Sequence, residues 1–124
     1  MEPTVEMLPD RYESLLLTFH DPKIVDGNIV IGNDEGTQLK MVDSAIFAVA
    51  TPDRFVNSSV DQLAACLAAH SKYVRSIAAA SSEETELLAV ESFVAEIQRI
   101  DPDSLANAEN WWAVIIEQMQ HGQL

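Results

Sequence analysis

The spacing of apolar residues changes once along this chain, near residue 60. Before that point, short apolar segments alternate with polar residues at a period of two, which is typical of β-strands. After it, apolar residues recur every three or four positions, which is typical of amphipathic helices. Strands followed by helices predict an α+β fold, in which a small antiparallel sheet precedes and packs against three C-terminal helices.

The predicted sheet is built from short strands separated by turn residues. Asp26-Gly27 favours a hairpin turn, and residues 32–36, with the sequence GNDEG, form a second expected turn. Residues 38–42 alternate in polarity, whereas residues 45–50 are almost uniformly apolar and predict a central strand covered on both faces. The expected strands are 24–25, 28–31, 38–42, 45–50 and 54–56.

The segment ahead of these strands predicts a short N-terminal helix at residues 10–19. Asp10 is placed to cap it, with Glu13 three residues further on. Asp21-Pro22 should end the helix, because the residue before a proline avoids helical geometry.

Capping signals mark the first two of the three C-terminal helices. Ser59 with Gln62 predicts a capping box at the first, and Ser81 with Glu84 predicts one at the second. The second helix should end at Asp101, which precedes a proline. The expected apolar stripes are Leu63, Leu67, His70, Val74 and Ile77 in the first helix, and Leu87, Val90, Val94, Ile97 and Ile100 in the second.

The third helix, about residues 108–120, carries two adjacent tryptophans, and Gly122 is placed to close it. Adjacent helical residues point about 100° apart. One tryptophan should therefore anchor the core while the other lies at a rim, where tryptophan is enriched in interfaces. The pattern does not decide which of Trp111 and Trp112 is which, and two purely structural tryptophans are the alternative.

The length and composition fit one domain, residues 1–124. Hydrophobic residues make up 48% of the chain, which is typical of a folded protein, and no apolar run reaches the about 18 residues of a membrane span. Residues 1–6 are acidic where a signal peptide would be basic. The single Cys66 cannot form an internal disulfide. We therefore expect a cytoplasmic protein.

The net charge of −13, from 20 acidic and 7 basic residues, limits the possible partners. Phosphate backbones and anionic membrane surfaces would be repelled, which excludes nucleic acid and membrane as expected partners. A basic protein would be attracted, and its encounter with this chain would be accelerated. The alternative is that the acidity only keeps the protein soluble.

Residues with catalytic or metal-binding chemistry are few and scattered. Cys66 lies in an alanine-rich helix and is expected to be a small buried residue rather than a nucleophile. His70 falls on an apolar stripe, and His20 and His121 are too far from it for a zinc site of known spacing. Residues 33–36 lack the ligand spacing of a calcium loop. We predict a protein that is not an enzyme and binds no cofactor or metal.

Three patterns resemble one known family. IGNDEG at residues 31–36 is followed by a strand pair, and RFVNSS at 54–59 is followed by QLAA at a helix start. The closing helix reads WWAVIIEQM, residues 111–119. Together, over residues 24–124, they resemble the SUKH superfamily of bacterial immunity proteins, most of all its fourth subfamily. The turn at residues 42–45 lacks the glycine expected of this family.

The resemblance implies an α+β immunity protein that binds and neutralises a cognate bacterial polymorphic toxin, such as a nuclease or a deaminase, by occluding its site. The acidic composition indicates that this toxin is basic, and we expect a monomer or weak dimer. An acidic secretion chaperone for an effector protein is the alternative, which a tight dimer with an exposed apolar groove would favour. The candidate partner-binding residues are Asp26, Asp34, Glu35, Asp43, Asp53 and Trp111.

Overall fold

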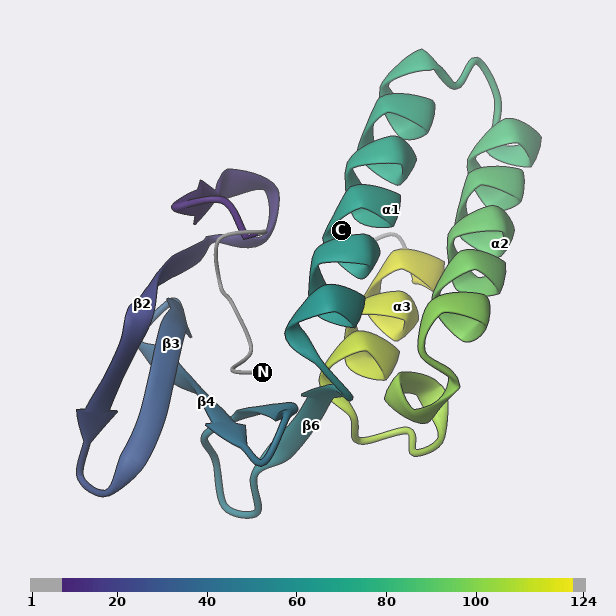
Figure 1. The fold of residues 1–124 in the computed structure, drawn as a ribbon. Coiled ribbons are helices and arrows are strands. Elements are labelled where there is room, and N and C mark those ends of the chain that lie inside the picture. Colours follow the sequence, from purple (N-terminus) through teal and green to yellow (C-terminus); the bar gives the residue numbers. More distant parts are fainter. Residues whose placement is uncertain (1–7, 122–124) are drawn as a thin grey trace.

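A computed structural model describes residues 8–121 and shows a six-stranded antiparallel sheet followed by three α-helices (Figure 1). The strands pair in chain order, so the sheet is a simple meander, and the α+β prediction is confirmed. The strands are β1 (Arg11–Tyr12), β2 (Leu17–Val25), β3 (Asn28–Asp34), β4 (Thr37–Val42), β5 (Ala45–Ala48) and β6 (Arg54–Asn57). The helices are α1 (Val60–Ala79), α2 (Glu83–Ile100) and α3 (Trp111–Gln120), with short 3₁₀ helices η1 (Glu13–Leu15) and η2 (Pro102–Leu105).

Tight turns with positive φ angles join the central strands. Asp26, Glu35 and Asp43 occupy this left-handed conformation in the turns after β2, β3 and β4. The hairpin at Asp26-Gly27 is therefore confirmed. Aspartate tolerates a positive φ better than most residues, so Asp43 can serve where the family pattern has glycine.

The turn predicted at residues 32–36 is shorter than expected. Gly32 lies within β3, and only Glu35-Gly36 form the turn. A Cβ atom at residue 32 would lie 2.2 Å from the carbonyl oxygen of Thr18, so glycine allows β2 and β3 to approach each other. The prediction was wrong because glycine followed by two polar turn-formers has the composition of a loop.

The predicted N-terminal helix at residues 10–19 is also wrong. The chain instead forms β1, the single turn of η1 and the start of β2, where Leu17 and Phe19 are buried. Pro22 does not end a helix but lies within β2, beyond the two residues of that strand that pair with β1. A proline is tolerated there because an edge strand leaves its outward amides without a ladder partner.

Strand β5 is covered on one face only, which corrects the prediction for residues 45–50. Ile46 and Ala48 are buried, whereas Ala45 and Phe47 are partly exposed. Phe47 packs edge to face against Phe55 of β6, with ring centroids 5.5 Å apart. The pattern alternates because helices cover one side of the sheet and leave the other open.

Helix α1 begins at the predicted cap, Ser59, but Gln62 does not complete the predicted capping box, because its side-chain oxygen accepts from the Ser59 hydroxyl at 2.8 Å. The Ser59 Oγ accepts a hydrogen bond from the Gln62 amide at 3.2 Å. The Gln62 side chain also donates to the Ile100 carbonyl at 3.3 Å, so it links the start of α1 to the end of α2. Helix α2 ends before Pro102, as expected from the sequence.

The N-cap of helix α2 is Ser82, one residue later than predicted. The Ser82 Oγ accepts from the Thr85 amide at 3.2 Å, and the Thr85 Oγ1 accepts from the Ser82 amide at 3.1 Å. This reciprocal capping box replaces the pair predicted at Ser81 and Glu84. The usual N3 residue of a capping box is glutamate or glutamine, so Glu84 is the stronger signal in the sequence and points to Ser81, one position before the cap in the structure.

The core lies between the inner face of the sheet and the helices. Val74 and Leu87, predicted for the apolar stripes, are exposed, and Tyr73 and Phe93 occupy core positions instead. The buried His70 ring lies among four aromatic rings, at centroid distances of 5.6 to 6.3 Å. These rings belong to Tyr12, Tyr73, Phe93 and Trp112.

Candidate functional site

A buried polar network holds the link between sheet and helices in place. Both oxygens of the Asp101 carboxylate accept hydrogen bonds, from the Asn57 side chain at 2.9 Å and from the amide and hydroxyl of Ser58 at 2.8 Å each. The Asn57 Oδ1 in turn accepts from the Trp112 Nε1 at 2.9 Å. Asn57 and Ser58 belong to the RFVNSS pattern, so this pattern fixes β6 against the end of α2 and against α3.

The two tryptophans of α3 are both buried. The helix begins at Trp111, later than the predicted residue 108, and Gly122 lies outside the described residues. Trp112 is fully buried and Trp111 is 8% exposed, so both belong to the core, which corrects the expectation that one of the two would lie at a rim. The Trp111 Nε1 donates to the Asp34 Oδ2 at 2.9 Å and so ties α3 to the end of β3.

Trp111 also forms one wall of a surface groove of about 460 Å³, here called the η1–α3 groove. Its walls come from the η1 turn, the β3–β4 turn, the segment from the end of β5 to β6, and α3. Among its lining residues are Leu16, Asp34, Glu35, Arg54, Trp111 and Ile115. The groove therefore combines an apolar wall with two carboxylates.

The predicted partner-binding residues divide into two groups. Asp34, Glu35 and Trp111 lie together at the η1–α3 groove. Asp26 and Asp43 lie at the opposite end of the sheet, because successive turns of an antiparallel meander alternate between its two ends. The structure does not bring these two groups into one site.

Asp53, the sixth candidate, lies in the loop between β5 and β6 and is already paired within the chain. Its carboxylate lies 2.7 Å from the Lys40 Nζ and accepts from the Ala50 amide at 2.9 Å. The hydrogen bond from Lys40, followed by that from Ala50, holds the pKa of Asp53 below its usual value. A partner that takes up Asp53 would have to compete with Lys40.

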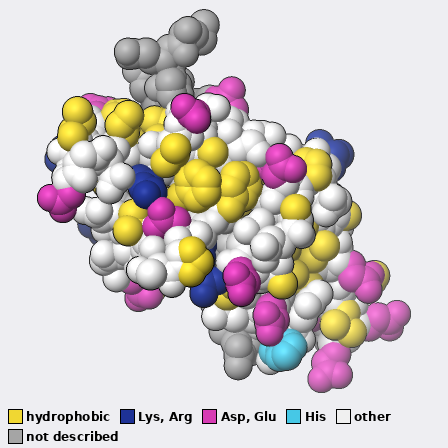
Figure 2. Space-filling view, turned by 90° about the horizontal axis from the view of Figure 1, so that it is seen from below, with side chains coloured by type: hydrophobic (Ala, Val, Ile, Leu, Met, Phe, Trp, Pro, Cys, Tyr) yellow, Lys and Arg dark blue, Asp and Glu magenta, His cyan; other side chains and the backbone are white. Residues whose placement is uncertain are grey.

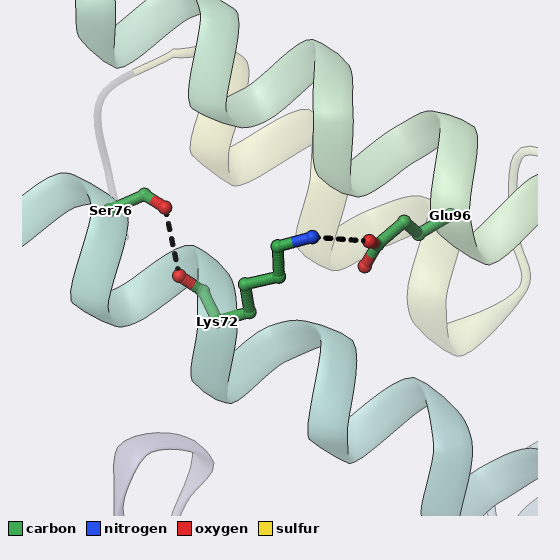
Figure 3. Close-up of polar contacts among 3 residues, drawn as sticks. All are labelled: Lys72, Ser76 and Glu96. Atoms are coloured by element: carbon green, nitrogen blue, oxygen red, sulfur yellow. Dashed lines mark hydrogen bonds and ion pairs between the residues drawn. The ribbon is translucent and has the colours of Figure 1, made fainter.

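Carboxylates outnumber basic groups across the surface. Figure 2 shows acidic side chains spread around the periphery of one face, with apolar side chains gathered nearer its centre. A second groove, of about 400 Å³, lies between α1 and α2. It is lined by Lys72 and Glu96, whose side chains form an ion pair at 2.9 Å, while the Ser76 hydroxyl donates to the Lys72 carbonyl (Figure 3).

The residues with reactive chemistry are part of the core. Cys66 is buried, and desolvation raises the pKa of its thiol to about 12, so little reactive thiolate forms at neutral pH. Burial lowers the pKa of His70 to about 4, and its Nδ1 is hydrogen-bonded to the Tyr12 hydroxyl at 2.7 Å. Across residues 8–121, no three His, Cys, Asp or Glu side chains are grouped to hold a metal.

The helices between residues 8 and 121 include none with the length and apolar character needed to cross a membrane.

Three residues of the grooves and the network were not singled out from the sequence. Leu16 is the middle one of three consecutive leucines, so the period of apolar residues does not tell which of the three are buried. The sequence marks Arg54 as a residue of a strand and of the RFVNSS pattern, and Asp101 as the end of a helix. Their partners lie far away in the chain, so no local signal marks these roles: Asp101 binds residues 43 and 44 positions away.

Comparison with known families gives one match. The family model of the SUKH-4 immunity protein matches residues 18–118, which includes β2 to β6 and all three α-helices up to the last turn of α3. A search of curated proteins and a search of solved structures each found no match. The matched region covers most of the chain, and the chain belongs to the SUKH-4 immunity protein family.

Proposed function

We propose that this protein neutralises a basic toxin domain in the cytoplasm by binding it and covering its active site or the path of its substrate. The observation that carries the proposal is the SUKH-4 family match over residues 18–118, because membership of an immunity family implies a cognate toxin partner. The charge of −13 supports the basic character of that toxin. No reaction and no cofactor are required of the immunity protein itself.

The carboxylates have two roles in this proposal. As a group, they speed the encounter with a basic partner through long-range attraction. In contact, carboxylates of the sheet take the place of an anionic substrate if the toxin is a nuclease or another enzyme of anionic substrates. Of the six candidates, Asp34, Glu35 and Trp111 are the proposed contact residues at the η1–α3 groove, and Asp26, Asp43 and Asp53 are proposed to contribute through long-range attraction.

The test uses a toxin candidate sought in the neighbouring reading frame, namely the C-terminal domain of a secreted protein encoded there. We expect co-expression with this chain to restore growth of cells that the domain kills, and the purified pair to form a stable complex. A basic toxin domain from an unrelated secreted protein serves as the control for nonspecific attraction. Unchanged killing together with no complex would contradict the proposal.

Two further measurements distinguish the immunity function from the alternative, an acidic secretion chaperone for an effector protein. A chaperone would form a tight dimer and would bind its effector only as an unfolded segment. Light scattering of this chain alone, and binding assays with native and urea-unfolded toxin domain, measure both properties. The immunity function requires binding to the native domain.

A further inference from the structure

We propose that the η1–α3 groove is the docking site of the toxin, and that it receives a basic segment carrying an apolar side chain, which packs against Leu16. The inference rests on the proposed function and adds the place and the chemistry of the contact. Three features support it: the conformation of Leu16, the charges lining the groove, and the number of segments that form its walls.

Leu16 has an unusual conformation for a leucine. It adopts a left-handed backbone, with φ of 56°, and its side chain is 57% exposed. Its amide closes η1 by donating to the Glu13 carbonyl at 3.1 Å. Glycine or asparagine would adopt this backbone with less strain, and a polar side chain would expose less apolar surface. Leucine at this position is therefore unfavourable for the isolated fold in both backbone and exposed surface, whereas a partner that covers the side chain would gain from it.

The charges of the groove favour a cationic partner. Glu35 is exposed at the tip of the β3–β4 turn, and Asp34 beside it is held by Trp111. Arg54 is the only basic residue among those lining this groove, and its guanidinium donates to the Glu109 carbonyl at 2.7 Å. The lining residues therefore carry a net negative charge, which complements a lysine or arginine of the partner.

The opposite end of the sheet offers the strongest competing surface. There the β2–β3 hairpin exposes Ile24, at 80%, and its cross-strand partner Ile29, close to the acidic turn at Asp26. This surface belongs to one hairpin, whereas the η1–α3 groove has walls from four segments of the chain, so a side chain of the partner would be enclosed on several sides. Enclosure on several sides allows a partner side chain to be desolvated, which is typical of residues that dominate binding.

The two hairpin turns provide a matched pair of charge reversals. Glu35 and Asp26 are both exposed, have φ of 49° and 50°, and each precede a glycine of positive φ. Glu35→Lys and Asp26→Lys therefore change the net charge equally in the same backbone setting. We expect Glu35→Lys to weaken binding of the toxin domain from the neighbouring reading frame at least tenfold more than Asp26→Lys does. An equal loss of affinity in the two variants, or a larger loss for Asp26→Lys, would contradict the proposal that the toxin docks at the η1–α3 groove.

The apolar contact is tested by a second pair, Leu16→Asn and Ile24→Asn, in the same calorimetric titration. We expect Leu16→Asn to lower affinity at least tenfold without lowering the melting temperature, because asparagine tolerates the left-handed backbone. Ile24→Asn should bind as the wild type does, and the reverse result would overturn the proposal. Hydrogen exchange of the wild-type complex gives an independent measurement, in which residues 14–16 and 34–37 should become protected.

The proposed function and the proposed docking site are contradicted by different results. A wild-type protein that does not bind the toxin domain contradicts the proposed function, and the docking site with it. A wild-type protein that binds while neither Glu35→Lys nor Leu16→Asn weakens the complex contradicts the docking site alone.

Discussion

Asp101 shows how a single buried residue joins three parts of this fold. Its carboxylate is almost fully buried and accepts all of its hydrogen bonds from Asn57 and Ser58. Through Asn57 the network reaches Trp112. A buried carboxylate is tolerated when its oxygens are hydrogen-bonded, and loss of those hydrogen bonds destabilises the folded protein.

We expect Asp101→Asn to destabilise the protein by about 2–3 kcal/mol, because one oxygen becomes an NH₂ group that faces donors. Urea denaturation measures the change. Asp103→Asn is the control, since Asp103 is exposed on η2 only two residues away. Equal midpoints for the two variants would show that the network contributes nothing to stability.

His70 predicts a dependence of stability on pH. Burial lowers its pKa to about 4, from an unfolded value near 6.5. Between these two values the unfolded chain binds the proton and the folded chain does not, so stability is complete above pH 6.5 and is lost as the pH falls towards 4. The neighbouring groups are the Tyr12 hydroxyl, which is bonded to the ring, and the rings of Tyr73, Phe93 and Trp112.

We expect the free energy of unfolding to fall by about 2 kcal/mol between pH 7 and pH 5 on account of His70. His70→Gln, which does not titrate, should lack this part of the decrease. Denaturant titrations of both proteins at pH 7, 6 and 5 give the difference. Parallel pH profiles would mean that His70 is protonated in the folded state as readily as in the unfolded chain.

At the scale of elements, the helix starts depend on particular serines. The hydroxyls of Ser59 and Ser82 accept hydrogen bonds from backbone amides in the first turns of α1 and α2. A serine cap stabilises a helix because the first backbone amides of the helix have no hydrogen-bond partner within it. The sequence indicated Ser59 correctly but placed the second cap at Ser81, where the structure has the residue before the cap.

We expect Ser59→Ala and Ser82→Ala each to cost about 0.5–2 kcal/mol of stability. Ser81→Ala should be close to neutral, because Ser81 lies outside the capping box. Chemical denaturation of the three variants separates the two assignments. A loss at Ser81 as large as that at Ser82 would show that the helix begins one residue earlier in solution.

The closing helix contributes to the fold through two tryptophans with different partners. Trp112 is fully buried and reaches the Asn57 network, and Trp111 reaches Asp34 at the groove. We expect Trp112→Ala to lose about 3–5 kcal/mol of stability. Trp111→Phe, which keeps a ring but removes the bond to Asp34, should lose only about 1 kcal/mol. Thermal denaturation compares them, and a loss in Trp111→Phe as large as that in Trp112→Ala would contradict this difference between the two side chains.

At the scale of the whole molecule, the acidic composition bears on the proposed association with a toxin domain. Twenty carboxylates against seven basic groups attract a basic partner over distances that salt can screen. We expect the association rate with the toxin domain to fall steeply as ionic strength rises, while the dissociation rate changes little. Stopped-flow measurements across a salt series test this. An association rate that is independent of salt would remove charge steering from the proposed function.

The sequence by itself determined the order of strands and helices from residue 24 onwards, the hairpin at Asp26-Gly27, the cap at Ser59 and the burial of Cys66. These features follow from local properties, namely the period of apolar residues, the conformations open to turn residues, and capping within one helical turn. Family membership could also be anticipated, because its patterns are short and local. Two members of the η1–α3 groove, Asp34 and Glu35, were indicated by their charge and turn position alone.

Tertiary structure alone decided where distant segments meet. Residues 17–25 form a strand because β3 is present to pair with them, and Gly32 remains in a strand because β2 approaches it. The bond between Trp111 and Asp34 spans 77 positions of the chain, and that between Asp101 and Asn57 spans 44. Such contacts form only once the sheet and the helices have packed, since nothing near either partner in the sequence specifies the other. The groove that gathers Leu16, Glu35 and Trp111 is therefore a property of the folded protein.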